Sequence, residues 1–191
     1  MPHNKDQDLV FTEIQLVQGC IKGDVICQKQ LYELYARKMM GVCLRYTKSH
    51  DEAEDMLQDG FIKMFKSIGQ YKGNGSLEGW VRRIMVNTAL ASLRKFNPLQ
   101  KSDDVQDFDI ANIDDPGIIS SLSAEDLLKM LQQLPDGYRL VFSLFALEGY
   151  SHKEIAEQLK ITESTSKSQF SRARAALQKM VQTEKMNVQY G

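Results

Sequence analysis

The chain has 191 residues, of which 42% are hydrophobic and 26% are charged. This composition is typical of a globular protein, and the length allows one medium domain or two small ones. No apolar run approaches the ~18 residues that a membrane span requires, and the N-terminal sequence MPHNKDQDLV lacks the basic start and apolar stretch of a secretory signal. We therefore expect a cytoplasmic protein.

The net charge is −1, but acidic and basic residues are unevenly distributed. The segment 79–102 is basic and contains no acid, the segment 103–126 contains eight acids and no Lys or Arg, and the segment 164–183 is basic again. This layout predicts two anion-binding surfaces joined by a segment with a different role. The cysteines (Cys20, Cys27 and Cys43) and histidines (His3, His50 and His152) have no metal-site or disulfide-framework spacing, so we expect no metal and no cofactor.

Helical periodicity dominates the chain, and no segment has the strict alternation of a strand, so we expect an all-α fold. The predicted helices are 8–17 ending before Gly19, 24–46 capped by Asp24, 51–68 capped by Asp51, 77–94, 124–134 and 138–147. Apolar residues at three- and four-residue steps mark the buried faces of the second and third helices. They are Leu31, Leu34, Tyr35, Val42 and Tyr46, then Ala53, Leu57, Phe61, Met64, Phe65 and Ile68.

Residues 96–121 lack helical periodicity and are strongly acidic. The Asn97-Pro98 and Pro116-Gly117 pairs also interrupt regular structure there. We therefore expect two small helical domains, at 8–95 and 122–183, joined by an acidic flexible linker at 96–121. In the free chain the two domains should move independently.

The C-terminal stretch from about 131 to 181 has the pattern of a helix-turn-helix that docks on double-stranded DNA. Ser151 and Glu154 are spaced as a capping box, Ile161 fills the turn and Thr162 caps the second helix. One face of that helix is apolar, and the other presents hydroxyls between cations, which suit phosphates and base edges. The predicted DNA-contacting residues are Ser164, Lys167, Ser168, Ser171 and Arg172.

Several motifs, in order along the chain, resemble those of bacterial sigma factors of the extracytoplasmic-function type. In the first half they are DEAEDMLQDGFIKMF (51–65), YKG (71–73) and GWVRRIMVNTAL (79–90). In the second half they are LPD (134–136), GYSHKEIA (149–156) and SQFSRAR (168–174). Ser166 and Gln169 stand where many relatives carry Val and Arg. The specific upstream sequence that those relatives read therefore does not carry over to this chain.

The resemblance implies a transcription initiation factor that binds core RNA polymerase and promoter DNA, without enzymatic activity or a small-molecule substrate. The helix 51–68 would contact the polymerase, through Asp51, Asp55, Gln58 and Asp59. The loop and helix that follow would open the downstream (−10) element, through Tyr71, Asn74, Trp80, Arg82, Arg83 and Asn87. The helix-turn-helix would hold the upstream (−35) duplex, and the acidic linker would thread the polymerase channel. An anti-sigma protein, often membrane-anchored in the family, is a further expected partner.

Two other interpretations stay open at the level of sequence. The chain is a conventional helix-turn-helix repressor or activator if its first half senses a ligand or dimerises, although a sensor domain has no need for the motifs at 51–90. It is an all-helical phosphohydrolase if His50, Glu54 and Asp55 carry chemistry. No Gly-rich phosphate loop or nucleophile with an adjacent base accompanies those three residues.

Overall fold

The computed structural model describes residues 11–96 and 123–190, with side chains of 94–96 and 184–190 excepted. Within these ranges every regular element is helical and no strand occurs, which confirms the all-α prediction. The predicted linker, apart from its first residue, lies outside the described residues, as does the predicted start of the first helix at residue 8. The domain boundaries stay predictions.

The first half consists of four helices and one short turn of 3₁₀-helix. They are α1 (Glu13–Ile21), α2 (Val25–Cys43), α3 (His50–Ser67), η1 (Ile68–Gln70) and α4 (Leu77–Phe96). The N-termini are set by side chains that accept hydrogen bonds from the first turn, an arrangement worth about 1 kcal/mol per helix. Thr12 forms a capping box with Gln15, Asp24 caps α2 as predicted, and Ser49 caps α3.

Three details of the sequence prediction are wrong here. The first helix begins at Glu13 and continues through Gly19, where a Cβ atom would lie 2.2 Å from Cys27 Sγ. Gly19 is therefore a point of close approach between α1 and α2, and not a helix stop. Asp51 lies inside α3, because Ser49 takes the capping position. Leu34, predicted to be buried, is 49% exposed.

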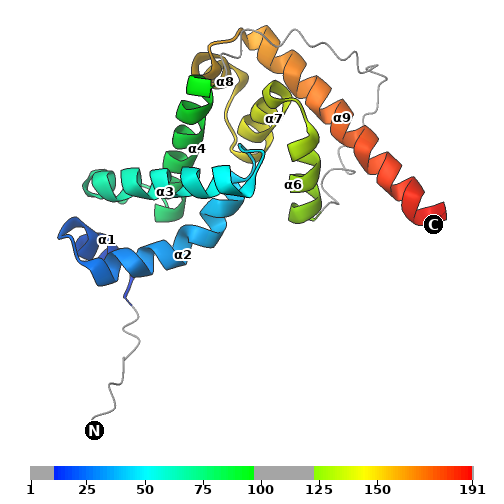
Figure 1. Cartoon of the computed structure of the whole chain (residues 1–191). Helices are drawn as coiled ribbons and strands as arrows, with labels where there is room; N and C mark the ends of the chain where they lie inside the picture. Colours follow the sequence, from blue (N-terminus) through cyan, green and yellow to red (C-terminus); the bar gives the residue numbers. More distant parts are fainter. Residues whose placement is uncertain (1–10, 97–122, 191) are drawn as a thin grey trace.

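The second half contains α6 (Ala124–Gln133), α7 (Asp136–Phe142), the π-helical turn η3 (Ser143–Leu147), α8 (His152–Leu159) and α9 (Glu163–Tyr190). The predicted helix 138–147 begins two residues earlier, at Asp136, and widens into the π-helical turn after Phe142. Figure 1 shows α1–α3 on one side, α8 at the upper end of α4, and α6, α7 and α9 on the other side, with α9 running past α6 and α7.

Two hydrophobic clusters hold the described residues together. One lies among α6, α7 and α9 and includes Leu131, Phe142 and Leu177. The other fills the space among α1–α4 and continues into the second half through Leu140, Val141, Leu144, Ile155 and Leu159. The larger core therefore crosses the predicted domain division.

Polar contacts cross the same division. Arg45, in the turn after α2, pairs with Glu148 at 3.0 Å, and Lys48 pairs with Asp136 at 3.0 Å. The halves thus form one packed arrangement, which differs from the expectation that they move independently. The physical reason is that every residue of α7 from Gly137 to Phe142 is buried. Leu140 and Val141 pack into the core of the first half, while Tyr138 and Phe142 pack into the cluster with α6 and α9.

Candidate nucleic-acid interface

The helix-turn-helix is built by α8, a tight turn and α9. Ser151 and Glu154 form the predicted capping box at the start of α8. Lys160 ends this helix in the left-handed region, with φ of 56°, which directs the chain into the next helix within two residues. Thr162 accepts a 3.0 Å hydrogen bond from the backbone N–H of Thr165, so the predicted cap of α9 is confirmed.

The face of α9 predicted to meet DNA points to solvent. Ser164, Lys167, Ser168 and Ser171 are exposed, and Arg172 is half-buried. Ala173 and Leu177 are fully buried on the opposite face. Lys167 also pairs with Glu163 at 2.7 Å, a contact between exposed groups that the sequence analysis did not foresee. Part of the charge of Lys167 is therefore balanced within the helix before any DNA arrives.

His152 and Ser166 form a link between α8 and α9 that the sequence analysis also missed. His152 Nδ1 lies 2.9 Å from the hydroxyl of Ser166, which is fully buried. The imidazole stacks on Phe145 at 4.2 Å and meets Phe170 edge-on at 5.8 Å. Burial, with a smaller contribution from Lys167, lowers the pKa of His152. The link fixes α9 at the residue directly before Lys167. The signal in the sequence was Ser166 itself, a polar residue where many relatives carry Val.

The first part of the predicted downstream interface is the loop before α4. Tyr71 donates a 2.8 Å hydrogen bond to the carbonyl of Gly75 and thereby closes the loop. Gly73 and Gly75 have φ of 74° and 95°, values that favour glycine. The ring of Trp80 lies 5.6 Å from that of Tyr71. Trp80 and Tyr71 are half-buried, so each keeps an accessible part of its ring, and Asn74 is exposed at the loop tip.

The second part lies on α4 itself. Trp80, Arg83 and Asn87 recur at three- and four-residue steps and so share one face of the helix, and Arg83 and Asn87 are exposed. Arg82 is placed differently, because its Nη1 atom lies 3.8 Å from the carboxylate of Glu148 in the second half. The structure brings the predicted downstream residues into one region but assigns Arg82 a partner of its own.

The four residues predicted to contact polymerase, Asp51, Asp55, Gln58 and Asp59, are all exposed on α3. Beside them is a hollow between α3 and α4, lined by Asp55, Asp59, Thr88 and Tyr46 among others. Tyr46 is buried there, and its hydroxyl has no hydrogen-bond partner among the residues that the structure describes. Within the described residues, His50, Asp51 and Glu54 have ligand atoms within 4.8 Å of one another, but all three are exposed at the end of one helix.

Comparisons with known proteins match both halves. The family described as sigma-70 region 2 matches residues 31–97, and sigma-70 region 4 matches residues 124–177. The chain is 28% identical over 179 residues to the RNA polymerase sigma-H factor of Pseudomonas aeruginosa, covering 88% of this chain and 93% of the relative. It is 29% identical over 183 residues to the ECF RNA polymerase sigma-E factor of Escherichia coli K12, covering 90% and 95%.

Among solved structures, the sigma factor RpoE of Bartonella quintana, in complex with the anti-sigma factor NepR, is similar at 28% identity and a TM-score of 0.49. The match covers 81% of this chain and 96% of that one. The chain belongs to the sigma-70 family, in its extracytoplasmic-function type. It is a promoter-specific transcription initiation factor that acts with RNA polymerase. The resemblance stated from sequence is thus confirmed. In the part of the chain that the structure describes, no helix is long and apolar enough to cross a bilayer.

Proposed function

We propose that the chain grips promoter DNA at two points, through different surfaces of its two halves. The supporting observation is the separation of two sets of exposed groups. One is the hydroxyl and cationic face of α9, and the other is the basic and aromatic face of α4. Hydroxyls and cations suit the base edges and phosphates of a duplex, whereas aromatic rings and cations suit the bases and phosphates of an opened single strand.

The α9 face is proposed to hold the upstream duplex. Short hydroxyls at Ser164, Ser168 and Ser171 allow the helix to approach a groove closely. Arg172 can donate hydrogen bonds to a base edge, and Lys167 can neutralise a phosphate. The exposure of all these residues, with Arg172 half-buried, supports the assignment. Ser164 lies in the first turn of α9, where backbone N–H groups also favour phosphate oxygens.

The α4 face and the preceding loop are proposed to hold the opened downstream strand. Single strands are bound by aromatic side chains that stack on bases and by cations that follow the backbone. Tyr71 and Trp80 supply the first, and Arg82 and Arg83 supply the second. Asn74 and Asn87 are exposed amides, and an amide can pair with the edge of an extruded base.

The exposed acidic face of α3 is proposed to bind core polymerase, through Asp51, Asp55, Gln58 and Asp59. In this proposal the chain works by binding alone, without covalent chemistry, in the cytoplasm. An anti-sigma protein is its proposed inhibitor. The first and second halves are proposed to act as separate domains, 8–95 and 122–183, once the chain is bound to polymerase.

Run-off transcription with core polymerase and genomic DNA from the source organism tests the proposal, with sequencing of the transcripts. We expect discrete start sites only when the protein is added. The Asp55→Lys/Asp59→Lys variant should lose core binding in a pull-down. The Ser171→Ala/Arg172→Ala variant should keep core binding and lose upstream protection in a footprint. Absence of both core binding and new start sites would overturn the proposal.

A further inference from the structure

The hydrogen bond between His152 and Ser166 lies inside the second half, directly behind the proposed upstream interface. Ser166 is fully buried in the first turn of α9, and its hydroxyl lies 2.9 Å from Nδ1 of His152. His152 is the first residue of α8. A buried hydroxyl that loses its partner costs more free energy than an ordinary hydrogen bond contributes. The pair therefore ties the start of α8 to the start of α9.

The imidazole of His152 is held in place by aromatic rings from two other elements. It stacks on Phe145 of η3, with ring centroids 4.2 Å apart, and meets Phe170 of α9 edge-on at 5.8 Å. These two phenylalanine rings also contact each other, at 4.6 Å. Because burial lowers the pKa of His152, the ring is uncharged at neutral pH, and its Nδ1 atom can bond the Ser166 hydroxyl in either tautomer. The ring thus holds Ser166 from a fixed position.

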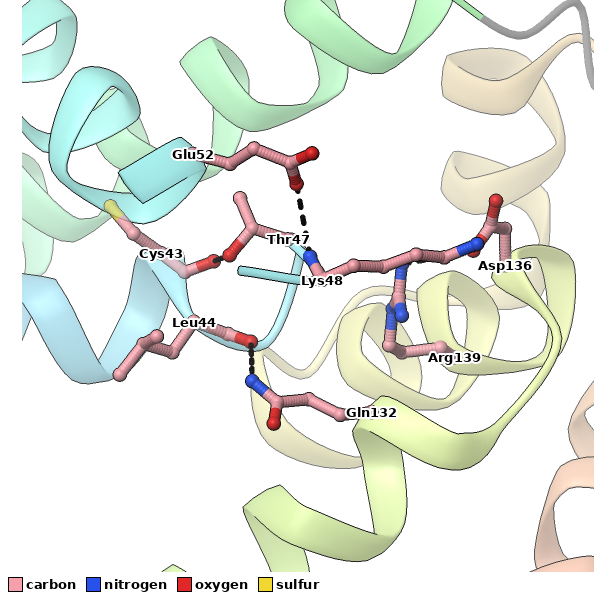
Figure 2. Close-up of polar contacts among 8 residues, drawn as sticks. All are labelled: Cys43, Leu44, Thr47, Lys48, Glu52, Gln132, Asp136 and Arg139. Carbon is pink, nitrogen blue, oxygen red and sulfur yellow. Dashed lines mark hydrogen bonds and ion pairs between the residues drawn. The ribbon is translucent and has the colours of Figure 1, made fainter. Parts of the chain in front are cut away.

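Gln169, almost one turn further along α9, packs against α7. A Cβ atom added to Gly137 of α7 would lie 3.0 Å from Gln169 Nε2. The start of α7 is itself anchored, because Asp136 accepts a 3.0 Å hydrogen bond from Arg139 and pairs with Lys48 at 3.0 Å (Figure 2). Both α9 positions that differ from many relatives therefore have contacts inside the protein.

We propose that His152 is a positioning residue for upstream DNA binding, which acts through the Ser166 hydroxyl to set the depth and rotation of α9. Lys167 and Ser168 directly follow Ser166 in the helix, so a rotation at this point moves both of them. Groups that contact a ligand must be held within about 0.5 Å of the binding geometry. His152 needs no contact with DNA in this role. The inference rests on the proposed role of α9.

Two substitutions at His152 separate the hydrogen bond from the packing of the ring. His152→Asn places an amide atom near the position of Nδ1, so it keeps a partner for Ser166 and removes the ring. His152→Phe keeps a ring against Phe145 and removes the partner. The measurement is upstream protection in a quantitative DNase footprint of the holoenzyme, on the promoter fragment that gives the most abundant run-off transcript.

We expect His152→Phe and Ser166→Ala each to weaken upstream binding about five-fold, the change that corresponds to the ~1 kcal/mol of one hydrogen bond. His152→Asn should keep most of the wild-type affinity. The double variant His152→Phe/Ser166→Ala should bind no more weakly than either single variant, because all three lose the same hydrogen bond. Thr183→Ala is the matched control, since it removes a 3.0 Å hydrogen bond to Lys179 at an exposed position of α9.

Core binding in a pull-down and helical content by circular dichroism should be unchanged in every variant. If a His152 variant loses helical content, the comparison of Ser166→Ala with Thr183→Ala decides. Binding by His152→Asn that is as weak as that of His152→Phe would assign the effect to the ring and overturn the proposal, as would additive losses in the double variant. Wild-type binding in all variants would overturn it and leave the role of α9 intact. Discrete start sites without upstream protection by the wild type would remove the role of α9, and the positioning role with it.

Discussion

The helices α9 and α4 both carry cations that are proposed to bind DNA, but these cations have different surroundings in the structure. On α9 the cation Lys167 pairs with Glu163 of the same helix, and the predicted DNA-contacting residues are exposed except Arg172, which is half-buried. On α4 the cation Arg82 meets Glu148 from the other half of the chain. An i,i+4 pair between exposed groups is weak, whereas leaving a nearly buried carboxylate without its cationic partners is costly. The proposed upstream interface therefore carries only a contact within its own helix at Lys167, whereas the proposed downstream interface has one cation, Arg82, beside a carboxylate of the other half.

The largest expected effect tests whether the halves form one cooperative unit. Leu144 is fully buried in the core that both halves share. Leu144→Ala should lower the free energy of unfolding by about 2–5 kcal/mol, as for other buried leucines, and urea denaturation should shift as a single transition. Two transitions, of which only one shifts, would show that the halves fold separately. Lys179→Ala, at an exposed position, serves as the control.

The next effect concerns strand opening on α4. Trp80→Ala should weaken binding of the opened strand by about 1–3 kcal/mol, because one stacking surface is lost. Permanganate reactivity of thymines in the downstream element should fall, while the upstream footprint of the holoenzyme is unchanged. Trp80→Phe keeps a ring beside Tyr71 and should restore much of the reactivity. Equal loss of both signals would indicate a general folding defect instead.

On α9, the pairing of Lys167 with Glu163 should restrain DNA binding slightly. Glu163→Gln removes the carboxylate that lies 2.7 Å from Lys167. The holoenzyme should then bind an upstream duplex, chosen from the mapped start sites, several-fold more tightly at low salt. The gain corresponds to the ~0.3–0.5 kcal/mol typical of an i,i+4 pair plus removal of a repelled charge. Weaker binding would mean that Glu163 positions Lys167 for the phosphate, and Glu157→Gln tests for a general charge effect.

The smallest effect is a pH dependence from His152. Its pKa in the folded chain lies below the ordinary value of 6.5, chiefly because of burial. Between the two values the unfolded chain binds more protons, so this contribution to stability is complete above pH 6.5 and is lost as the pH falls through the folded pKa. Thermal unfolding of the wild type should show this loss, and His152→Gln should reduce it. An unchanged slope in the variant would assign the effect to other groups.

The sequence by itself determined most of the local structure. Helical periodicity, capping residues and turn residues act over a few positions, so the starts of α2, α4, α8 and α9 were predictable, although α2 ends at Cys43 and not at the predicted Tyr46. The same holds for the two motif groups that carry the family resemblance, and for the exposed face of α9. Failures such as Gly19 and Leu34 came from contacts between helices, where a neighbouring side chain decides whether a position is buried or must be small.

Only the tertiary structure decided how the two halves meet. The partners of Glu148 come from the turn after α2 and from α4, far away in the sequence, and no periodicity links them. Ser166 and His152 are likewise joined only because α8 and α9 cross. A buried polar group is costly to leave without its partner, and burial depends on the whole fold and not on local sequence. The sequence therefore predicted candidate surfaces for DNA, which stay predictions, while the fold decided that Arg82 on one of them lies 3.8 Å from a carboxylate of the other half.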